Sequence, residues 1–188
     1  IMLSTLANVG VTGENAVQFT LNKFQAQALT VMPNEMWIVA ARGTGKTIGI
    51  EAPWILHKVS AMPRSNGGFI GQTFAQIEEK LLQPLQMAFQ QLGYKKHTTK
   101  EPGQYVYGKK PPEEWPEPLT PIIDYSHVMT FYNGTTLEFI SLHLQGSANA
   151  KSLQWLVADE AKYLNQERLQ TEVFPILRGH IDAFGDSA

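Results

Sequence analysis

Cysteine is absent from the 188-residue chain, and its absence excludes a disulfide framework and any metal site built from thiolates. A large excess of charge of one sign is also missing, because the formal net charge at pH 7 is only -2. No global positive field therefore predicts a nucleic-acid partner, and any such role has to rest on local motifs.

Long hydrophobic runs are missing too, since no apolar stretch approaches the ~20 residues that span a bilayer. The N-terminus has no basic region followed by an apolar core, so we expect a soluble, non-secreted protein. With 43% hydrophobic residues, residues 1–188 suffice for one compact domain. The chain begins at Ile1 and ends in a polar run, residues 185–188, which suggests a fragment of a longer protein.

Short apolar runs alternate with segments of helical periodicity, which is typical of an α/β domain. The predicted strands are residues 35–40, 68–73, 127–132, 135–141 and 153–158, and the predicted helices are residues 23–30, 47–59, 74–92 and 165–177. Asn133-Gly134 favours a two-residue type I′ turn and predicts an antiparallel hairpin. Pro53 is expected to kink its helix or lie within its first turns, and Gly93 to end the longest helix.

Residues 95–121 differ in character from the rest of the chain. They hold six of the eleven prolines and five lysines, and their apolar residues have no periodicity. We interpret them as a loop inserted within the domain, which is either a solvated insert or a contact for DNA or a partner.

A glycine-rich turn, residues 41–47 (ARGTGKT), follows the first predicted strand and opens a predicted helix, as in a phosphate-binding P-loop. Gly43 and Gly45 let the backbone curl so that its N–H groups point at phosphate oxygens. Lys46 then neutralises the β- and γ-phosphates, and Thr47 supplies a hydroxyl for Mg²⁺. The full pattern has glycine where this chain has Ala40, which is unstrained only at a negative φ.

Two adjacent carboxylates, Asp159 and Glu160, directly follow the last predicted strand, as in the Walker B element of ATPases that activate water. We expect Asp159 to join Thr47 in holding Mg²⁺, and Glu160 to orient the water that attacks the γ-phosphate. The stretch between Lys46 and Asp159 leaves room for a further strand, which residues 69–73 supply. Together the two motifs predict an ATPase.

The chain resembles the large terminase subunit, the DNA-packaging motor of tailed bacteriophages, in its N-terminal ATPase domain. The resemblance covers about residues 20–180 and rests on Phe24-Gln25, Arg42, residues 71–74 (GQTF), the Asn133-Gly134 hairpin, residues 146–149 (GSAN) and residues 159–161 (DEA). It implies the P-loop NTPase fold, a three-layer α/β sandwich with a mostly parallel central sheet and an added β-hairpin.

The resemblance also implies ATP and Mg²⁺ as ligands and assigns roles to particular residues. Gln25, Ala41, Arg42, Gly43, Thr44, Gly45, Lys46 and Thr47 would bind the nucleotide, Thr47 and Asp159 the metal, while Glu160, Lys46 and Arg42 would be catalytic. Gln25 would read the adenine edge, or else is an ordinary surface glutamine. Arg42 would approach the γ-phosphate, or it would make the strength of DNA binding depend on which nucleotide is bound.

The implied partners are double-stranded DNA, a portal protein, a small terminase subunit and further copies of the chain in a ring, in the cytoplasm of an infected host cell. A nuclease domain would lie in sequence beyond residue 188. Two alternatives stay open: a helicase-like DNA-dependent ATPase, and an assembly module that binds nucleotide without hydrolysing it.

Overall fold

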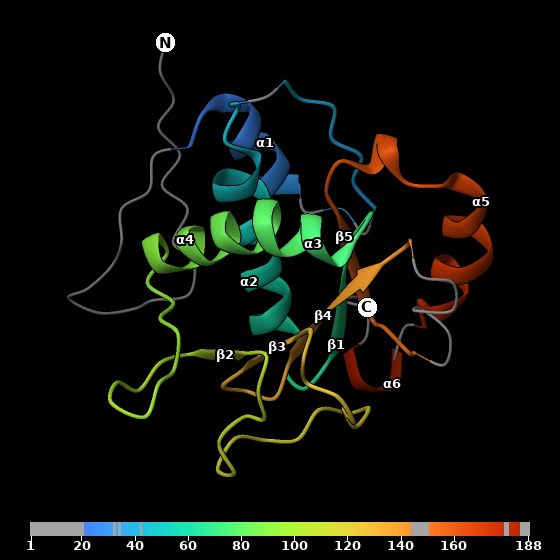
Figure 1. The fold of residues 1–188 in the computed structure, drawn as a ribbon. Helices are drawn as coiled ribbons and strands as arrows, with labels where there is room; N and C mark the ends of the chain where they lie inside the picture. The colour runs from blue at the N-terminus through green and yellow to red at the C-terminus, as the bar shows by residue number, and fades with distance from the viewer. Residues whose placement is uncertain are drawn as a thin grey trace.

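The computed structural model describes residues 21–31, 33, 35–41, 43–143, 151–178 and 181–184, and these form a mixed α/β fold around a five-stranded sheet (Figure 1). The strands are β1 (Asn66–Gly71), β2 (Tyr105–Tyr107), β3 (Val128–Phe131), β4 (Thr136–Ser141) and β5 (Trp155–Ala158), in the order β2-β3-β4-β1-β5. β1 runs parallel to both β4 and β5, whereas β3 is antiparallel to β2 and β4. The sheet therefore has a parallel core and an antiparallel side.

Helical segments connect and cover the strands. The segments before β1 are α1 (Lys23–Val31), η1 (Thr47–Glu51) and α2 (Ala52–Ala61). The segments between β1 and β2 are α3 (Phe74–Gln76), η2 (Ile77–Leu82) and α4 (Gln83–Gln91). After β5 they are η3 (Ala161–Tyr163), α5 (Gln166–Arg168), η4 (Leu169–Val173), η5 (Phe174–Ile176) and α6 (Ile181–Phe184). Among the described residues, no helix combines the length and the apolar character needed to cross a membrane.

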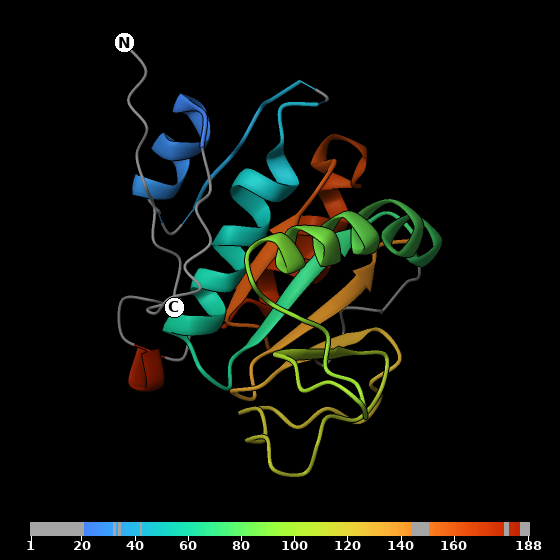
Figure 2. The ribbon, with the colours of Figure 1, turned by 90° about the vertical axis from the view of Figure 1, so that its left-hand side faces the viewer.

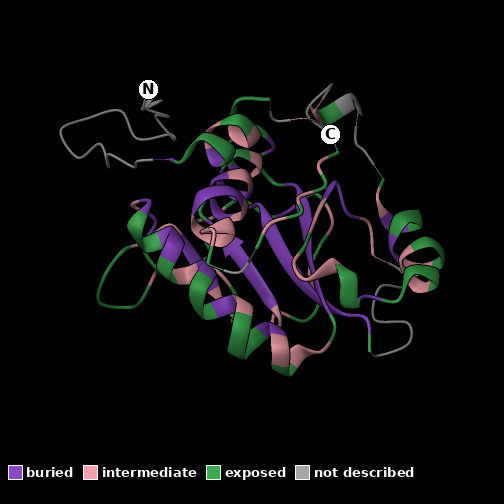
Figure 3. Ribbon diagram, turned by 90° about the horizontal axis from the view of Figure 1, so that it is seen from above, coloured by how far each residue is buried: buried purple, intermediate pink, exposed green. Residues whose placement is uncertain are grey.

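Helices pack on both faces of the sheet (Figure 2). On one face, α2 and α4 bury side chains such as Leu56 and Phe89 against Phe69 and Phe139, which are register partners on β1 and β4. On the other face, Val173 and neighbouring residues after β5 pack on the alternate side chains of the same strands. Strands β1, β3 and β4 are consequently buried, whereas the helices expose their outer sides (Figure 3).

One predicted strand is wrong. Residues 35–40 belong to no strand, and the side chains of Trp37 and Val39 are 72% and 98% exposed. An apolar β-branched run forms a strand only when a neighbouring strand supplies hydrogen bonds and cover. Within the described residues β5 pairs with β1 alone, so residues 35–40 form no ladder with β5.

The predicted hairpin is confirmed, but its turn differs from the expected type I′. β3 and β4 pair antiparallel, and Gly134 N–H donates to Phe131 O over 2.9 Å. Gly134 has a φ of 82°, whereas Asn133 lies outside the positive-φ region, and type I′ requires positive φ at both central residues. Asn133 instead donates through Nδ2 to Val59 O, which ties the turn to α2.

The inserted residues 95–121 are more ordered than the prediction of a loop. Tyr105–Tyr107 form β2 and extend the sheet beyond β3. Tyr105 and Val106 are 3% and 0% exposed, and Tyr105 packs edge-on against Phe89 of α4. A three-residue strand shows too few alternations to be detected by periodicity.

The other predicted elements are confirmed. η1 and α2 form one continuous helical segment, and Pro53 lies in the first turn of α2, two residues after the π-helical turn ends at Glu51. The segment 74–91 is likewise continuous, and Gly93 follows it with a φ of 86°.

Candidate functional site

The loop before η1 has the backbone that its glycines predict. Gly43 and Gly45 adopt φ values of 77° and 71°, a region that L-residues seldom occupy. The hydroxyl of Thr44 donates to Ala41 O over 2.9 Å and closes the turn from within. Ala40 is outside the positive-φ region, so alanine there carries no backbone strain.

The loop lies against the carboxyl end of β5. Lys46 Nζ is 4.0 Å from Asp159 Oδ1, and the two side chains are 27% and 14% exposed. Asp159 occupies this place because β5 ends at Ala158, beside the parallel β1. The predicted convergence of the lysine and the first carboxylate, which are far apart in sequence, is therefore present.

A third carboxylate, that of Glu51, joins these two groups and was not predicted. Burial is the main cause that raises its pKa, to about 7, and the negative charge of Asp159 raises it further. The Thr47 hydroxyl and the Lys46 ammonium act in the opposite direction. Its Oε2 atom is buried without a hydrogen-bond partner among the described residues. The sequence held a signal, because a residue four positions after Thr47 shares its helical face.

Glu160 lies next to Asp159, but its carboxylate pairs with Lys162. Its carboxylate is 3.7 Å from Lys162 Nζ and its side chain is 40% exposed. Its backbone has a φ of 51°, and its N–H donates to Asp159 Oδ1 over 2.8 Å. A left-handed glutamate is strained, and such strain is concentrated at functional sites.

Gln25 reaches the same loop from α1, which contacts the start of the η1–α2 segment (Figure 1). The residue is only 6% exposed, so it is not an ordinary surface glutamine. Its Nε2 atom is 3.2 Å from Thr44 O and 3.1 Å from Gly45 O. The structure thus brings together Gln25 with residues 43–47, Glu51 and Asp159. Arg42 and the stretch 146–149 lie outside the described residues.

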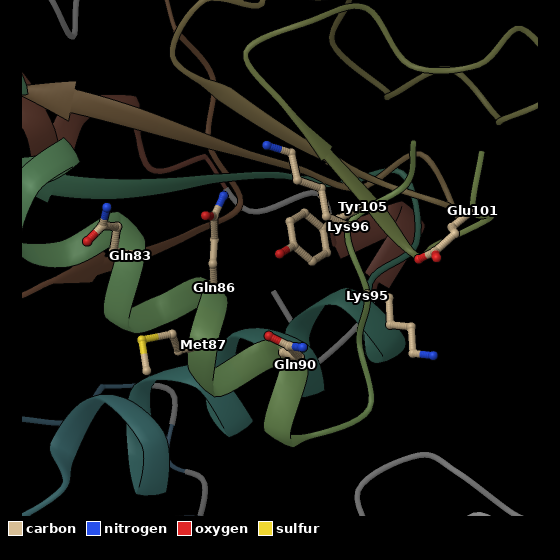
Figure 4. A pocket seen from close by; sticks show the side chains of 8 residues that line it. All are labelled: Gln83, Gln86, Met87, Gln90, Lys95, Lys96, Glu101 and Tyr105. Atoms are coloured by element: carbon tan, nitrogen blue, oxygen red, sulfur yellow. The ribbon is translucent and has the colours of Figure 1, made fainter. Parts of the chain in front are cut away.

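A separate hollow of 510 Å³ lies between α4 and the inserted residues (Figure 4). Its lining is rich in amide and charged side chains: Gln83, Gln86, Met87, Gln90, Lys95, Lys96, Glu101 and Tyr105. It shares no residue with the site around Lys46, and its lysine and glutamine side chains do not converge on one point in Figure 4.

Comparison of the chain with protein-family models, with curated proteins and with solved structures gives no match.

Proposed function

We propose that the chain is a P-loop ATPase domain that binds MgATP at the loop of residues 41–47 and hydrolyses it. The observation that carries the proposal is the 4.0 Å approach of Lys46 Nζ to Asp159 Oδ1. In P-loop NTPases a loop lysine contacts the phosphates of a nucleoside triphosphate and a carboxylate at a strand end holds its metal, so the two groups lie at one site. The parallel core with helices on both faces is compatible with the P-loop NTPase fold.

The residues present suit a magnesium ion. Thr47, Asp159 and Glu51 offer hydroxyl and carboxylate oxygens, the ligands that this ion prefers. The unpartnered Glu51 Oε2 is a buried acceptor for which such an ion, or its bound water, accounts. Bound there, Mg²⁺ would neutralise charge on the phosphates. Thr47 and Asp159 would hold it directly, and Glu51 would support them.

The residues of the chain then have separate roles in binding and hydrolysing ATP. The N–H groups of the glycine loop and of the helix that follows it face the phosphates as fixed donors. Lys46 offsets the negative charge of the β- and γ-phosphates. Glu160 orients the attacking water and accepts a proton from it. For this its carboxylate has to leave Lys162, and its 40% exposed side chain has room to do so.

We further propose that this ATPase is the motor of a large terminase, which moves double-stranded DNA into a capsid with a portal protein, a small terminase subunit and a ring of identical chains. The support is the order of the features in the sequence: Gln25, the loop with its arginine, the β3–β4 hairpin and the acidic pair.

One observation favours a second candidate, a module that binds nucleotide without hydrolysing it. The carboxylate of Glu160 is paired with Lys162 rather than directed at Lys46. If that pairing persists with ATP bound, Glu160 is not in place to activate water.

Two variants separate the candidates. Lys46→Ala removes the charge that faces the phosphates and should abolish ATP binding measured by calorimetry, whereas Lys80→Ala, an exposed lysine on η2, should leave it intact. Glu160→Gln should bind ATP normally yet release no phosphate. Equal and negligible phosphate release by the parent and by Glu160→Gln, with DNA present, would favour the non-hydrolysing module. Retained binding by Lys46→Ala would contradict both candidates.

A further inference from the structure

Gln25 has its amide oxygen fixed by its own helix. Asn22 and Gln25 form a capping box at the start of α1: Gln25 N–H donates to Asn22 Oδ1, and Asn22 N–H donates to Gln25 Oε1, each over 2.9 Å. The spacing Asn-x-x-Gln sets this pair, because the capping residue and the third helical residue face each other.

The amide nitrogen of Gln25 is fixed by the loop. Nε2 carries two hydrogens, and the acceptors within reach are Thr44 O and Gly45 O. Reading adenine requires a donor for N7 and an acceptor for the N6 amino group, which are the two functions of this amide. With both acceptors of its Nε2 hydrogens inside the protein, the side chain has no donor left for N7 of a base.

Holding these two carbonyls has a direct consequence for the loop. In a trans peptide the C=O and the following N–H point in opposite directions. Drawing Thr44 O and Gly45 O toward Gln25 therefore turns the N–H groups of Gly45 and Lys46 away from it, to the side that faces a phosphate. Gly45 O also accepts the Gly49 N–H over 2.8 Å, so the same contact joins the loop to the helix start.

Gly45 and Gly49 lie directly against the side chain of Gln25, where a larger residue would clash with it. A Cβ atom on Gly45 would lie 2.9 Å from Gln25 Nε2, and one on Gly49 would lie 2.1 Å from the same atom. Two loop and helix residues thus leave room for this one buried side chain, which is 6% exposed. Such close packing is consistent with a fixed support and not with a side chain that must swing out to meet a base.

We propose that Gln25 is a positioning residue that orients the phosphate loop and contributes nothing to base selection. The inference rests on the proposed nucleotide-binding function and deepens it. Gln25 then acts on the binding of the triphosphate and not of the base. The affinities for adenine nucleotides, guanine nucleotides and inorganic tripolyphosphate therefore depend on Gln25 equally.

Gln25→Glu is the sharpest variant, because glutamate keeps the acceptor of the capping box and loses the Nε2 donor. Gln27→Glu is its matched control, with the same change on an exposed position of the same helix. Dissociation constants are measured for MgATP, MgGTP and magnesium tripolyphosphate. We expect Gln25→Glu to weaken all three by about tenfold, which corresponds to about 1.4 kcal/mol, and Gln27→Glu to weaken none.

Base reading predicts a different pattern. Gln25→Glu would then change the ratio of ATP to GTP affinity and leave tripolyphosphate unaffected, and this result would overturn the inference. If the parent binds all three ligands and Gln25→Glu binds them equally well, the inference fails and the proposed function stands. If the parent binds none of the three, the proposed function fails, and the inference fails with it.

A second measurement needs no ligand. Gln25→Leu removes the Nε2 hydrogen bonds to the loop without adding charge, and it also removes the acceptor of the capping box. Amide hydrogen exchange then reports on the loop directly. We expect faster exchange at residues 43–49 in both Gln25 variants than in the parent and in Gln27→Glu, with melting curves showing that all four proteins are folded. Unchanged exchange in folded Gln25 variants would overturn the positioning role.

Discussion

Lys46 Nζ lies 4.0 Å from Asp159 Oδ1, which joins the loop before η1 to the end of β5. Both side chains are mostly buried, at 27% and 14% exposure, so water screens their attraction less than at an open surface. Each charge offsets the other, and a change to one alters what the other can bind.

Asp159→Asn should therefore separate the binding of the metal from the binding of the phosphates. The amide keeps the size of the side chain but supplies no charge to Mg²⁺, so we expect ATP affinity in magnesium to fall by about tenfold or more. In EDTA the affinity should stay equal or rise, because Lys46 no longer faces a competing anion. Calorimetry in the two buffers checks this, with the exposed Asp124→Asn as control. An equal loss in both buffers would contradict the assignment of Asp159 to the metal.

Glu51 should make the protein less stable as pH rises. Its pKa is raised from 4.5 to about 7, so between these values the folded chain keeps a proton that the unfolded chain has released. The contribution is complete below pH 4.5 and is lost as pH rises through about 7, by at most about 3 kcal/mol.

Urea unfolding from pH 4.5 to 8, in buffer without metal or nucleotide, measures this loss. Glu51→Gln should remove it and flatten the profile, whereas the exposed Glu79→Gln should follow the parent. Parallel profiles for the parent and Glu51→Gln would show that Glu51 titrates at its ordinary pKa.

The two loop glycines should differ in their response to alanine. Beyond its chain neighbours, Gly43→Ala meets no atom of the described residues within 4 Å, so its cost should be the strain of a positive φ alone, about 1–2 kcal/mol. Gly45→Ala adds a contact of 2.9 Å with Gln25 Nε2 to a similar φ. We expect it to lower the free energy of unfolding more and to weaken ATP binding more. Equal effects of the two variants in denaturant titrations and calorimetry would contradict this packing.

Glu160 should be a residue whose replacement stabilises the fold while stopping the reaction. Asparagine tolerates the left-handed backbone better than glutamate, so Glu160→Asn should raise the free energy of unfolding by about 0.5–1 kcal/mol. Glu160→Gln keeps the strain, loses the same charge near Lys162, and should show no such gain. Thermal unfolding and phosphate release check the two halves of the prediction, and a gain for both variants would locate the effect in the charge.

Local patterns in the sequence predicted much of the fold and part of the site. The 3-4 spacing of apolar residues placed the long helix that ends before Gly93, and the apolar run before Asp159 placed β5. The same reasoning failed for residues 35–40, whose composition suits a strand but whose neighbours in the described structure do not supply one. It also missed β2, because three residues carry too little pattern.

The sequence by itself determined the left-handed loop at Gly43 and Gly45, the helix that follows it and the carboxylates that follow a strand, because these depend on backbone preferences within a few residues. Only the tertiary structure decided that β5 lies beside β1, which sets Asp159 near Lys46, and that Glu51 and the amide of Gln25 are buried there. Strand neighbours and burial arise from contacts between residues distant in sequence, and no local pattern encodes which distant surface will cover a side chain.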